Sequence, residues 1–238
     1  MRSRRMRLLF ACVPWLLSTS CFAVTQHVRA ETVQAEPMDA ALIQEALRSR
    51  LTVHVHQRTG ERTATKHCRH AAEGCDTRLA EFSKYMLESS EQYGLDPWLL
   101  AAMAFRESGL NPFAVGTRGE KGILQLHPKN KRAQTVRFVQ DATYRARCQR
   151  EAGACQREVV ERAAFILASS LNKCGRDLEK ALGMYNTGRC GGSLTYAKRV
   201  LAERARLMSL AGVDATAPVL TEPQRVAASA PSASTRAR

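Results

Sequence analysis

The stretch P-W-L-L-A-A-M-A-F-R-E, residues 97–107, decides the fold of this chain. Its side chains are apolar on every side until Arg106, and a helix of this kind is normally buried in a protein core. Asp96 is a good N-cap residue, and Pro97 suits the first helical position. The sequence S-G-L-N-P that follows supplies a glycine and a proline that end the helix. The pattern therefore predicts a buried helix with Glu107 at its end.

The segments around this stretch predict further helices and very little strand. Leu79, Phe82, Tyr85, Met86 and Leu87 give the residues between Arg78 and Gly94 a broad apolar face. Helical patterns also cover residues 39–50, 157–172, 177–185 and 194–210. Only L-T-V-H-V-H, residues 51–56, alternates as a strand does, and residues 59–76 are polar and are expected to be irregular. The expected fold class is mainly α.

The N-terminus has the features of a secretory signal. Residues 1–7, M-R-S-R-R-M-R, are basic, and residues 8–17, L-L-F-A-C-V-P-W-L-L, are apolar. This apolar run is shorter than the roughly 20 residues that a membrane-spanning helix needs, so no permanent span is expected. Cleavage is expected after Ala23 or Ala30, and the alternative is a signal anchor that stays uncleaved.

A lipid anchor at Cys21 is a further alternative, weakened by Ser18, which stands where such sites usually have an aliphatic residue. Residues 213–238 are rich in Pro, Ala and Ser and have few large apolar side chains, which is typical of disorder. The expected organisation is a signal peptide (1–30), an N-terminal extension (31–76), a globular domain (77–212) and a disordered tail (213–238).

The chain is strongly basic, with 36 Lys and Arg against 22 Asp and Glu and a net charge of +14. Cleavage after Ala30 would remove five arginines and no acidic residue, which leaves a charge near +9. A basic exported protein suits an anionic polymer, and both the cell wall and nucleic acid meet that description. The chain contains no recognisable nucleic-acid-binding motif, so a role that rests on charge alone is not expected.

Six cysteines follow the predicted signal, and an even number in an exported chain indicates disulfides. Six cysteines allow 15 connectivities. Their spacing favours three short-range pairs, namely Cys68 with Cys75, Cys148 with Cys155, and Cys174 with Cys190. The alternative for the first pair is a metal site with His67 and His70, but the usual ligand spacings of structural zinc are missing.

Glu107 is the most informative polar residue. Leu100, Met103 and Ala104 precede it at helical spacing, so its carboxyl group is expected on or beside an apolar stripe. Burial raises the pKa of a carboxyl, and a general acid needs a raised pKa to hold its proton at neutral pH. The alternative is a helix-end glutamate paired with Arg106 or with a later arginine.

Two later segments strengthen the case for a ligand site. Residues 114–126, A-V-G-T-R-G-E-K-G-I-L-Q-L, form a glycine-rich loop with one amide side chain, Gln125, which can donate to and accept from sugar groups. Residues 181–188, A-L-G-M-Y-N-T-G, place Tyr185 on an apolar helical face and end the helix at Gly188. The Tyr185 hydroxyl is a candidate to reach the acid.

The sequences E-S-G-L-N-P, G-x-x-G-x-x-G-I-L-Q-L and A-L-x-x-Y-N-x-G, in this order, resemble the three motifs of the lytic transglycosylase domain of the soluble type, which is related to goose-type lysozymes. The resemblance covers about residues 90–200. It implies a lysozyme-like helical fold, a peptidoglycan substrate and Glu107 as the catalytic residue. It also places Ser108, Gln125, Tyr185 and Asn186 in or around the sugar-binding cleft.

The chain departs from the family pattern at two positions. Gly116 stands where the family often has Ser, and Glu120 stands where it often has Ala. Glu120 is expected to add a second carboxylate near the cleft.

The resemblance implies cleavage between N-acetylmuramic acid and N-acetylglucosamine with a 1,6-anhydro product, and no cofactor or metal. One rival is a hydrolytic lysozyme in which Glu120 or another acid activates water. The other is a non-catalytic component of the wall or of a secretion apparatus. The expected partner is peptidoglycan, in the periplasm or outside the cell, and a monomer is the default.

Overall fold

The computed structural model describes residues 39–216 and is mainly helical, as the sequence predicts. The predicted signal peptide and residues 217–238 of the predicted tail lie outside the described residues. In chain order the elements are α1 (Ala40–Leu51), β1 (Thr52–Val55), β2 (Arg62–Ala64), α2 (Lys66–Arg69), α3 (Cys75–Tyr93), α4 (Pro97–Ser108), α5 (Arg137–Gln140), α6 (Ala142–Arg147), α7 (Arg157–Lys173), α8 (Leu178–Thr187) and α9 (Leu194–Leu210), with 3-10 turns at Cys148–Arg150 and Ala154–Gln156.

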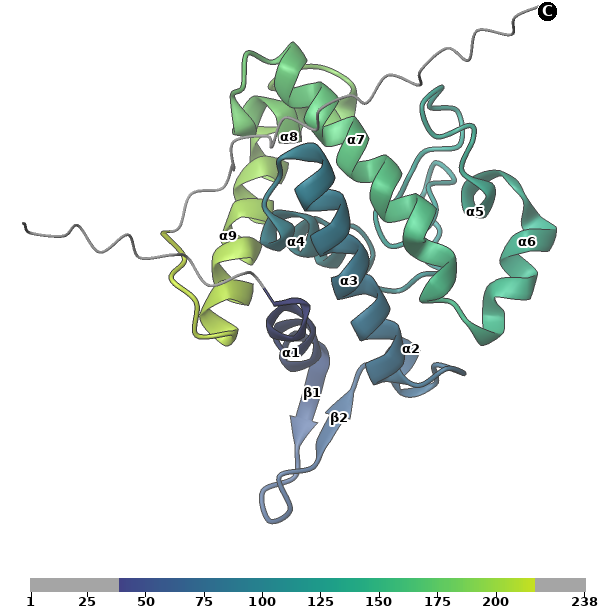
Figure 1. Ribbon diagram of the computed structural model, residues 1–238, viewed down its shortest axis with the longest axis vertical. Helices are drawn as coiled ribbons and strands as arrows, with labels where there is room; N and C mark the ends of the chain where they lie inside the picture. The colour runs from purple at the N-terminus through teal and green to yellow at the C-terminus, as the bar shows by residue number, and fades with distance from the viewer. Residues whose placement is uncertain (1–38, 217–238) are drawn as a thin grey trace, which may run out of the picture. The chain divides into compact units, whose positions relative to one another are not determined.

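Helix α4 is the predicted buried helix. The Asp96 side chain accepts a hydrogen bond from the Trp98 N–H at 3.0 Å, and the helix ends at Gly109, whose φ of 60° is left-handed. All eight residues from Pro97 to Ala104 are buried. Helices α3 and α9 lie beside it (Figure 1). Because the preceding turns of α4 are buried, the core fixes the position of its C-terminal turn, which carries Glu107.

The surrounding helices each turn an apolar face inwards. Phe82 and Met86 of α3 are fully buried, whereas Leu87 is half-buried at the edge of the predicted face. Val159 of α7 and Val200 of α9 complete this core from the other sides. The three late helices have nearly the predicted bounds, because amphipathic periodicity is a local signal that survives into the folded chain.

The region before α3 belongs to the same core. Ile43, Ala46 and Leu47 of α1 are fully buried in the hydrophobic cluster that contains α4. The predicted strand at 51–56 is confirmed as β1, which pairs antiparallel with β2. This hairpin extends away from the helices (Figure 1).

The prediction that residues 59–76 are irregular was wrong in part, because they contain β2 and α2. Strand β2 is only three residues long, and none of its side chains is buried, so it has no apolar alternation for a sequence analysis to detect. It forms because the chain turns at Gly60, with a φ of 69°, and then pairs with β1.

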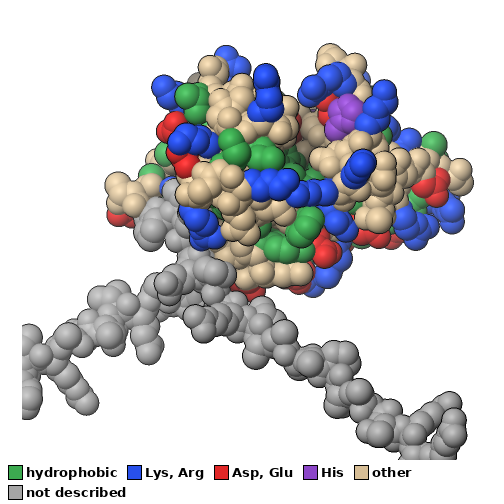
Figure 2. Space-filling model, turned by 90° about the horizontal axis from the view of Figure 1, so that it is seen from above, with side chains coloured by type: hydrophobic (Ala, Val, Ile, Leu, Met, Phe, Trp, Pro, Cys, Tyr) green, Lys and Arg blue, Asp and Glu red, His purple; other side chains and the backbone are tan. Residues whose placement is uncertain are grey.

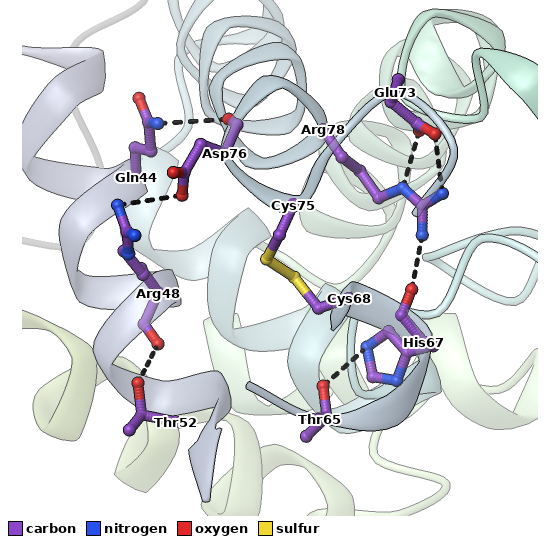
Figure 3. The surroundings of a disulfide bond; sticks show 10 residues. All are labelled: Gln44, Arg48, Thr52, Thr65, His67, Cys68, Glu73, Cys75, Asp76 and Arg78. Carbon is purple, nitrogen blue, oxygen red and sulfur yellow. Dashed lines mark hydrogen bonds and ion pairs between the residues drawn. A yellow bond between two sulfur atoms is a disulfide. The ribbon is translucent and has the colours of Figure 1, made fainter. Parts of the chain in front are cut away.

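All three predicted cysteine pairs are disulfides: Cys68–Cys75, Cys148–Cys155 and Cys174–Cys190. The first joins α2 to the first residue of α3 (Figure 3). Beside it, Arg78 donates to Glu73 at 2.7 Å and to the backbone carbonyl of His67 at 2.9 Å. The sulfur atoms of the alternative metal site are therefore bonded to each other.

The chain continues past α9 in contact with that helix. The Val213 N–H donates to the Met208 carbonyl at 2.9 Å, and Arg204 Nη1 donates to the Ala215 carbonyl at 3.1 Å. Residues 213–216, which the sequence assigns to the tail, thus pack against α9. Within residues 39–216, no helix is long and apolar enough to cross a membrane.

Asp96 and Arg204 form an ion pair that ties α4 to α9, with only 5% of each side chain exposed. Replacing Asp96 with Ala removes both the N-cap of α4 and the carboxylate that faces a buried guanidinium. We expect Asp96→Ala to lower the free energy of unfolding by about 3–5 kcal/mol, measured by urea denaturation. Arg62→Ala, which breaks the exposed pair with Glu45, should cost less than about 1 kcal/mol. Equal losses in the two variants would contradict this role of the buried pair.

Candidate active site

A cleft opens beside the C-terminal end of α4. It is lined by residues from α4, the loop between α4 and α5, α7 and α8, which are Glu107, Gly116, Thr117, Arg118, Glu120, Gln125, Leu126, His127, Asn130, Ile166, Tyr185 and Asn186. The cleft therefore brings together four of the five residues that the sequence assigns to the site. Ser108, the fifth, is not one of its lining residues.

Glu107 is half-buried in this cleft, and its carboxyl group has a strongly perturbed pKa. Burial raises the pKa of Glu107 to about 7, and the negative charge of Glu120 adds to the rise. A hydrogen bond from the Tyr196 hydroxyl to Oε1, at 2.5 Å, acts in the opposite direction. Glu107 forms no ion pair with Arg106 or any other described residue, so the alternative of a paired surface glutamate does not hold. Near neutral pH both protonation states are populated, as a group that gives and takes a proton requires.

The hydroxyl that reaches Glu107 belongs to Tyr196 and not, as the sequence suggested, to Tyr185. The Tyr185 hydroxyl donates to the Leu124 carbonyl at 2.8 Å, which ties α8 to the glycine-rich loop. Tyr196 lies in the first turn of α9, 89 residues after Glu107. The sequence offered one weak signal for it, a tyrosine on the inner face of the helix that follows the Y-N-x-G motif.

Close packing of α8 on the start of α9 puts Tyr196 in place. A Cβ atom on Gly183 would lie 3.0 Å from the Ser193 nitrogen and 3.1 Å from the Gly191 carbonyl carbon, so any other residue would crowd the backbone that leads into α9. The Cys174–Cys190 disulfide fastens the same connection. The Ser193 hydroxyl then caps α9 by accepting the Tyr196 N–H at 3.3 Å.

Ser108 connects the end of α4 to the glycine-rich loop. Its hydroxyl donates to the Ile123 carbonyl at 2.9 Å and to the Ala104 carbonyl at 3.2 Å. On the far side of the loop, the Ile123 N–H donates to Gln156 Oε1 at 3.0 Å. Ser108 therefore acts on the geometry of the cleft through the loop.

Gln125 and Asn186 are two amide side chains of the cleft with different hydrogen bonding. Gln125 has a φ of 46°, and its Nε2 donates to the carbonyls of Ala114 and Gly122 at 3.1 and 2.9 Å. The oxygen of Gln125 thus remains as an acceptor. The Asn186 side chain makes no hydrogen bond to a described residue, which leaves both its donor and its acceptor for a ligand.

The two departures from the family pattern lie against each other. A Cβ atom on Gly116 would lie 2.4 Å from Glu120 Oε2, so the glycine makes room for the carboxylate. Arg118 donates to Glu120 twice, from its backbone N–H at 2.9 Å and from Nε at 2.8 Å. Burial raises the pKa of Glu120, but these hydrogen bonds, the one from its own backbone N–H and the Arg118 charge outweigh it, so the net pKa is lowered. The cleft therefore contains one ionised carboxylate and one that titrates near neutrality.

Within residues 39–216, no group of three or more His, Cys, Asp or Glu side chains is arranged to hold a metal ion.

The pKa of Glu107 should move in opposite directions in two variants. Tyr196→Phe removes a hydrogen bond that favours the carboxylate, so the pKa should rise above about 7. Glu120→Gln removes a like charge, so the pKa should fall. Carboxyl ¹³C NMR titration measures both shifts, and Tyr185→Phe is the control, because its hydroxyl bonds to Leu124. Shifts of the same sign in the two variants would contradict this account.

Comparison with known proteins identifies the domain that carries this cleft. The Transglycosylase SLT domain family matches residues 84–192, a range that includes Glu107, Gln125 and Tyr185 and ends four residues before Tyr196. No solved structure matches the chain. Residues 84–192 are thus a transglycosylase SLT domain, a domain of the lysozyme-like lytic transglycosylase family, whose substrate is peptidoglycan.

Proposed function

We propose that this protein cleaves the β-1,4 bond between N-acetylmuramic acid and N-acetylglucosamine and leaves 1,6-anhydro ends, with Glu107 as its only acid and base. The observation that carries the proposal is the half-buried carboxyl with a pKa of about 7, placed in a cleft of the SLT domain. A single group that titrates at the working pH can serve as acid in one step and as base in the next.

In the first step, Glu107 gives its proton to the glycosidic oxygen while the bond from that oxygen to the anomeric carbon of the muramyl sugar breaks. The neighbouring N-acetyl group stabilises the positive charge at that carbon. In the second step, the Glu107 carboxylate takes the proton of the muramyl 6-hydroxyl, whose oxygen bonds to the anomeric carbon. The ring closes within one molecule and needs no water, and such closures have large effective molarities. Glu107 ends the cycle protonated.

Tyr196 supports the carboxylate state between the two steps. Its hydroxyl donates to Oε1 of Glu107, and a hydrogen bond to a carboxylate stabilises the charged form. The pKa of Tyr196 itself is raised well above its usual range by burial and by the charge of Glu107, so it stays a donor. We assign the binding of sugar hydroxyl and N-acetyl groups to the Gln125 oxygen and the Asn186 amide, which line the cleft and have free hydrogen-bonding capacity.

The rival hydrolytic mechanism needs a second carboxylate that activates water. Glu120 is ionised and lines the same cleft. However, both of its oxygens accept hydrogen bonds from Arg118, which ties them to the loop and lowers their basicity. This arrangement favours the transglycosylase mechanism. A non-catalytic role does not require a carboxyl group with a raised pKa, so the pKa of Glu107 favours an enzyme.

We also propose that the protein works outside the cytoplasm. Its family acts on the cell wall, its three disulfides suit an oxidising compartment, and residues 1–30 have the pattern of a secretory signal.

Glu107→Gln should reduce glycan cleavage at least about 100-fold, because it removes the only proton donor and acceptor of the mechanism. Mass spectrometry of digested sacculi measures both the yield and the chemistry of the ends. The wild type should leave anhydro ends, which are lighter than reducing ends by one water. Reducing ends from the wild type would support the hydrolase instead.

The same variant provides its own folding control. The pKa of Glu107 is about 7 in the folded protein and about 4.5 in the unfolded chain. Ionisation of Glu107 therefore lowers the free energy of unfolding as the pH rises from about 4.5 to about 7. Glu107→Gln should therefore be at least as stable as the wild type above neutral pH. Glu91→Gln, at an exposed position of α3, is the matched variant that should retain full activity.

A further inference from the structure

The cleft at Glu107 continues into a second cavity with a different character. The two cavities share six lining residues, which are Arg118, His127, Asn130, Ile166, Tyr185 and Asn186. Beyond these, the second cavity runs between the loop after Gln125 and the facing ends of α7 and α8. A polymer bound at Glu107 thus has a groove into which a substituent can extend.

We call this second cavity the cationic arm and define it by Arg118, Lys129, Lys131, Arg132 and Lys173. No Asp or Glu is among the described residues that line it. Lys129, Lys131 and Lys173 are exposed, and none of them forms an ion pair with a described residue. Figure 2 shows a hollowed face of the molecule on which Lys and Arg side chains border the hollow. The positive charges of these three lysines are therefore not neutralised by any ion pair within residues 39–216.

Arg118 lies where the two cavities meet, and Glu120 fixes its orientation. The Glu120 carboxylate holds both the backbone N–H and Nε of Arg118, while the two terminal guanidinium nitrogens make no hydrogen bond to a described residue. The side chain is 68% exposed. A guanidinium held in this way presents a planar edge that suits a carboxylate. Gly116 permits the arrangement, because a side chain there would displace the Glu120 carboxylate.

We propose that the cationic arm binds the free carboxylates of the stem peptides that hang from the glycan strand, and that the protein thereby prefers strands with charged peptides. This inference rests on the proposed function, which places the glycan at Glu107. The glycan backbone is neutral, and its acidic groups are on the peptides attached to the muramyl sugar, so carboxylates reach the arm when that sugar lies beside Glu107. The arm begins at Arg118, in the wall of the same cleft.

The effect should be moderate because the lysines are exposed. A single exposed ion pair changes affinity by no more than about fivefold, and two or more acting together give on the order of tenfold. Salt screens such pairs, so the preference should shrink as ionic strength rises.

The test measures a preference factor, defined as kcat/KM on native glycan strands divided by kcat/KM on the same strands after their peptide carboxylates have been converted to amides. We expect a factor of about ten for the wild type. Lys131→Ala/Lys173→Ala removes one cation from each side of the arm, from the loop and from the end of α7, and should lower the factor several-fold, because only three of the five cations remain. Arg58→Ala/Lys198→Ala removes the same charge at exposed positions outside both cavities and should retain the wild-type factor.

A third substrate, glycan freed of its peptides by an amidase, separates the two levels of the proposal. If the wild type cleaves none of the three substrates, the proposed function itself fails. If the wild type cleaves native and amidated strands equally well, the proposed glycan cleavage is supported but the inference fails, because the cationic arm then does not select charged peptides. The amidase leaves one lactyl carboxylate on each muramyl sugar. A salt-sensitive loss of affinity for this peptide-free glycan in the lysine variant would also overturn the inference, because it would assign the arm to carboxylates on the glycan and not to those of the peptides. An equal fall in the factor for the control variant would do the same, because net charge alone would then explain it.

Discussion

The burial of one carboxyl group at the end of an apolar helix is the constraint on which the rest of this structure depends. Helix α4 is enclosed on all sides over its first eight residues, and only its last turn reaches a cleft. Its start is held by the Asp96–Arg204 pair and its end by the left-handed Gly109. The position of the Glu107 side chain is therefore set by the core, and its environment makes ionisation costly.

Opposing influences set the pKa of that carboxyl. Burial and the charge of Glu120 raise it, and the hydrogen bond from Tyr196 and the charges of Arg106 and Arg118 lower it. The balance lies close to neutral pH, where a single group can both give and receive a proton. Because Tyr196 comes from α9 and Glu120 from the glycine-rich loop, the chemistry of the site depends on how α9 and this loop pack around α4. The Cys174–Cys190 disulfide and the close approach at Gly183 stabilise one side of that packing.

Local patterns in the sequence were enough to predict the helices, the buried carboxyl of Glu107 and the disulfides. Apolar periodicity and capping residues act over a few positions, so they indicated the buried helix that ends at Glu107 and the later helices. The cysteine pairs were predictable because each closes a short segment, seven residues apart in Cys68–Cys75 and Cys148–Cys155 and 16 in Cys174–Cys190. Three motifs in order were enough to predict the family, because most of the cleft residues of the matched domain lie within them; His127, Asn130 and Ile166 lie outside.

Only the tertiary structure decided which groups meet at the acid. Tyr196 and Glu107 are 89 residues apart, and the tyrosine predicted from the motif, Tyr185, bonds instead to the loop. The link between Gly116 and Glu120 is likewise visible only in the folded chain. The two residues are separate departures in the sequence, but in the structure the missing side chain of Gly116 leaves the space that the Glu120 carboxylate occupies. Periodicity and composition contain no information on such contacts, because they arise where helices and loops distant in sequence pack together. The sequence thus determined the fold class and the burial of the Glu107 carboxyl, and packing determined the partners of that carboxyl and the shape of the groove.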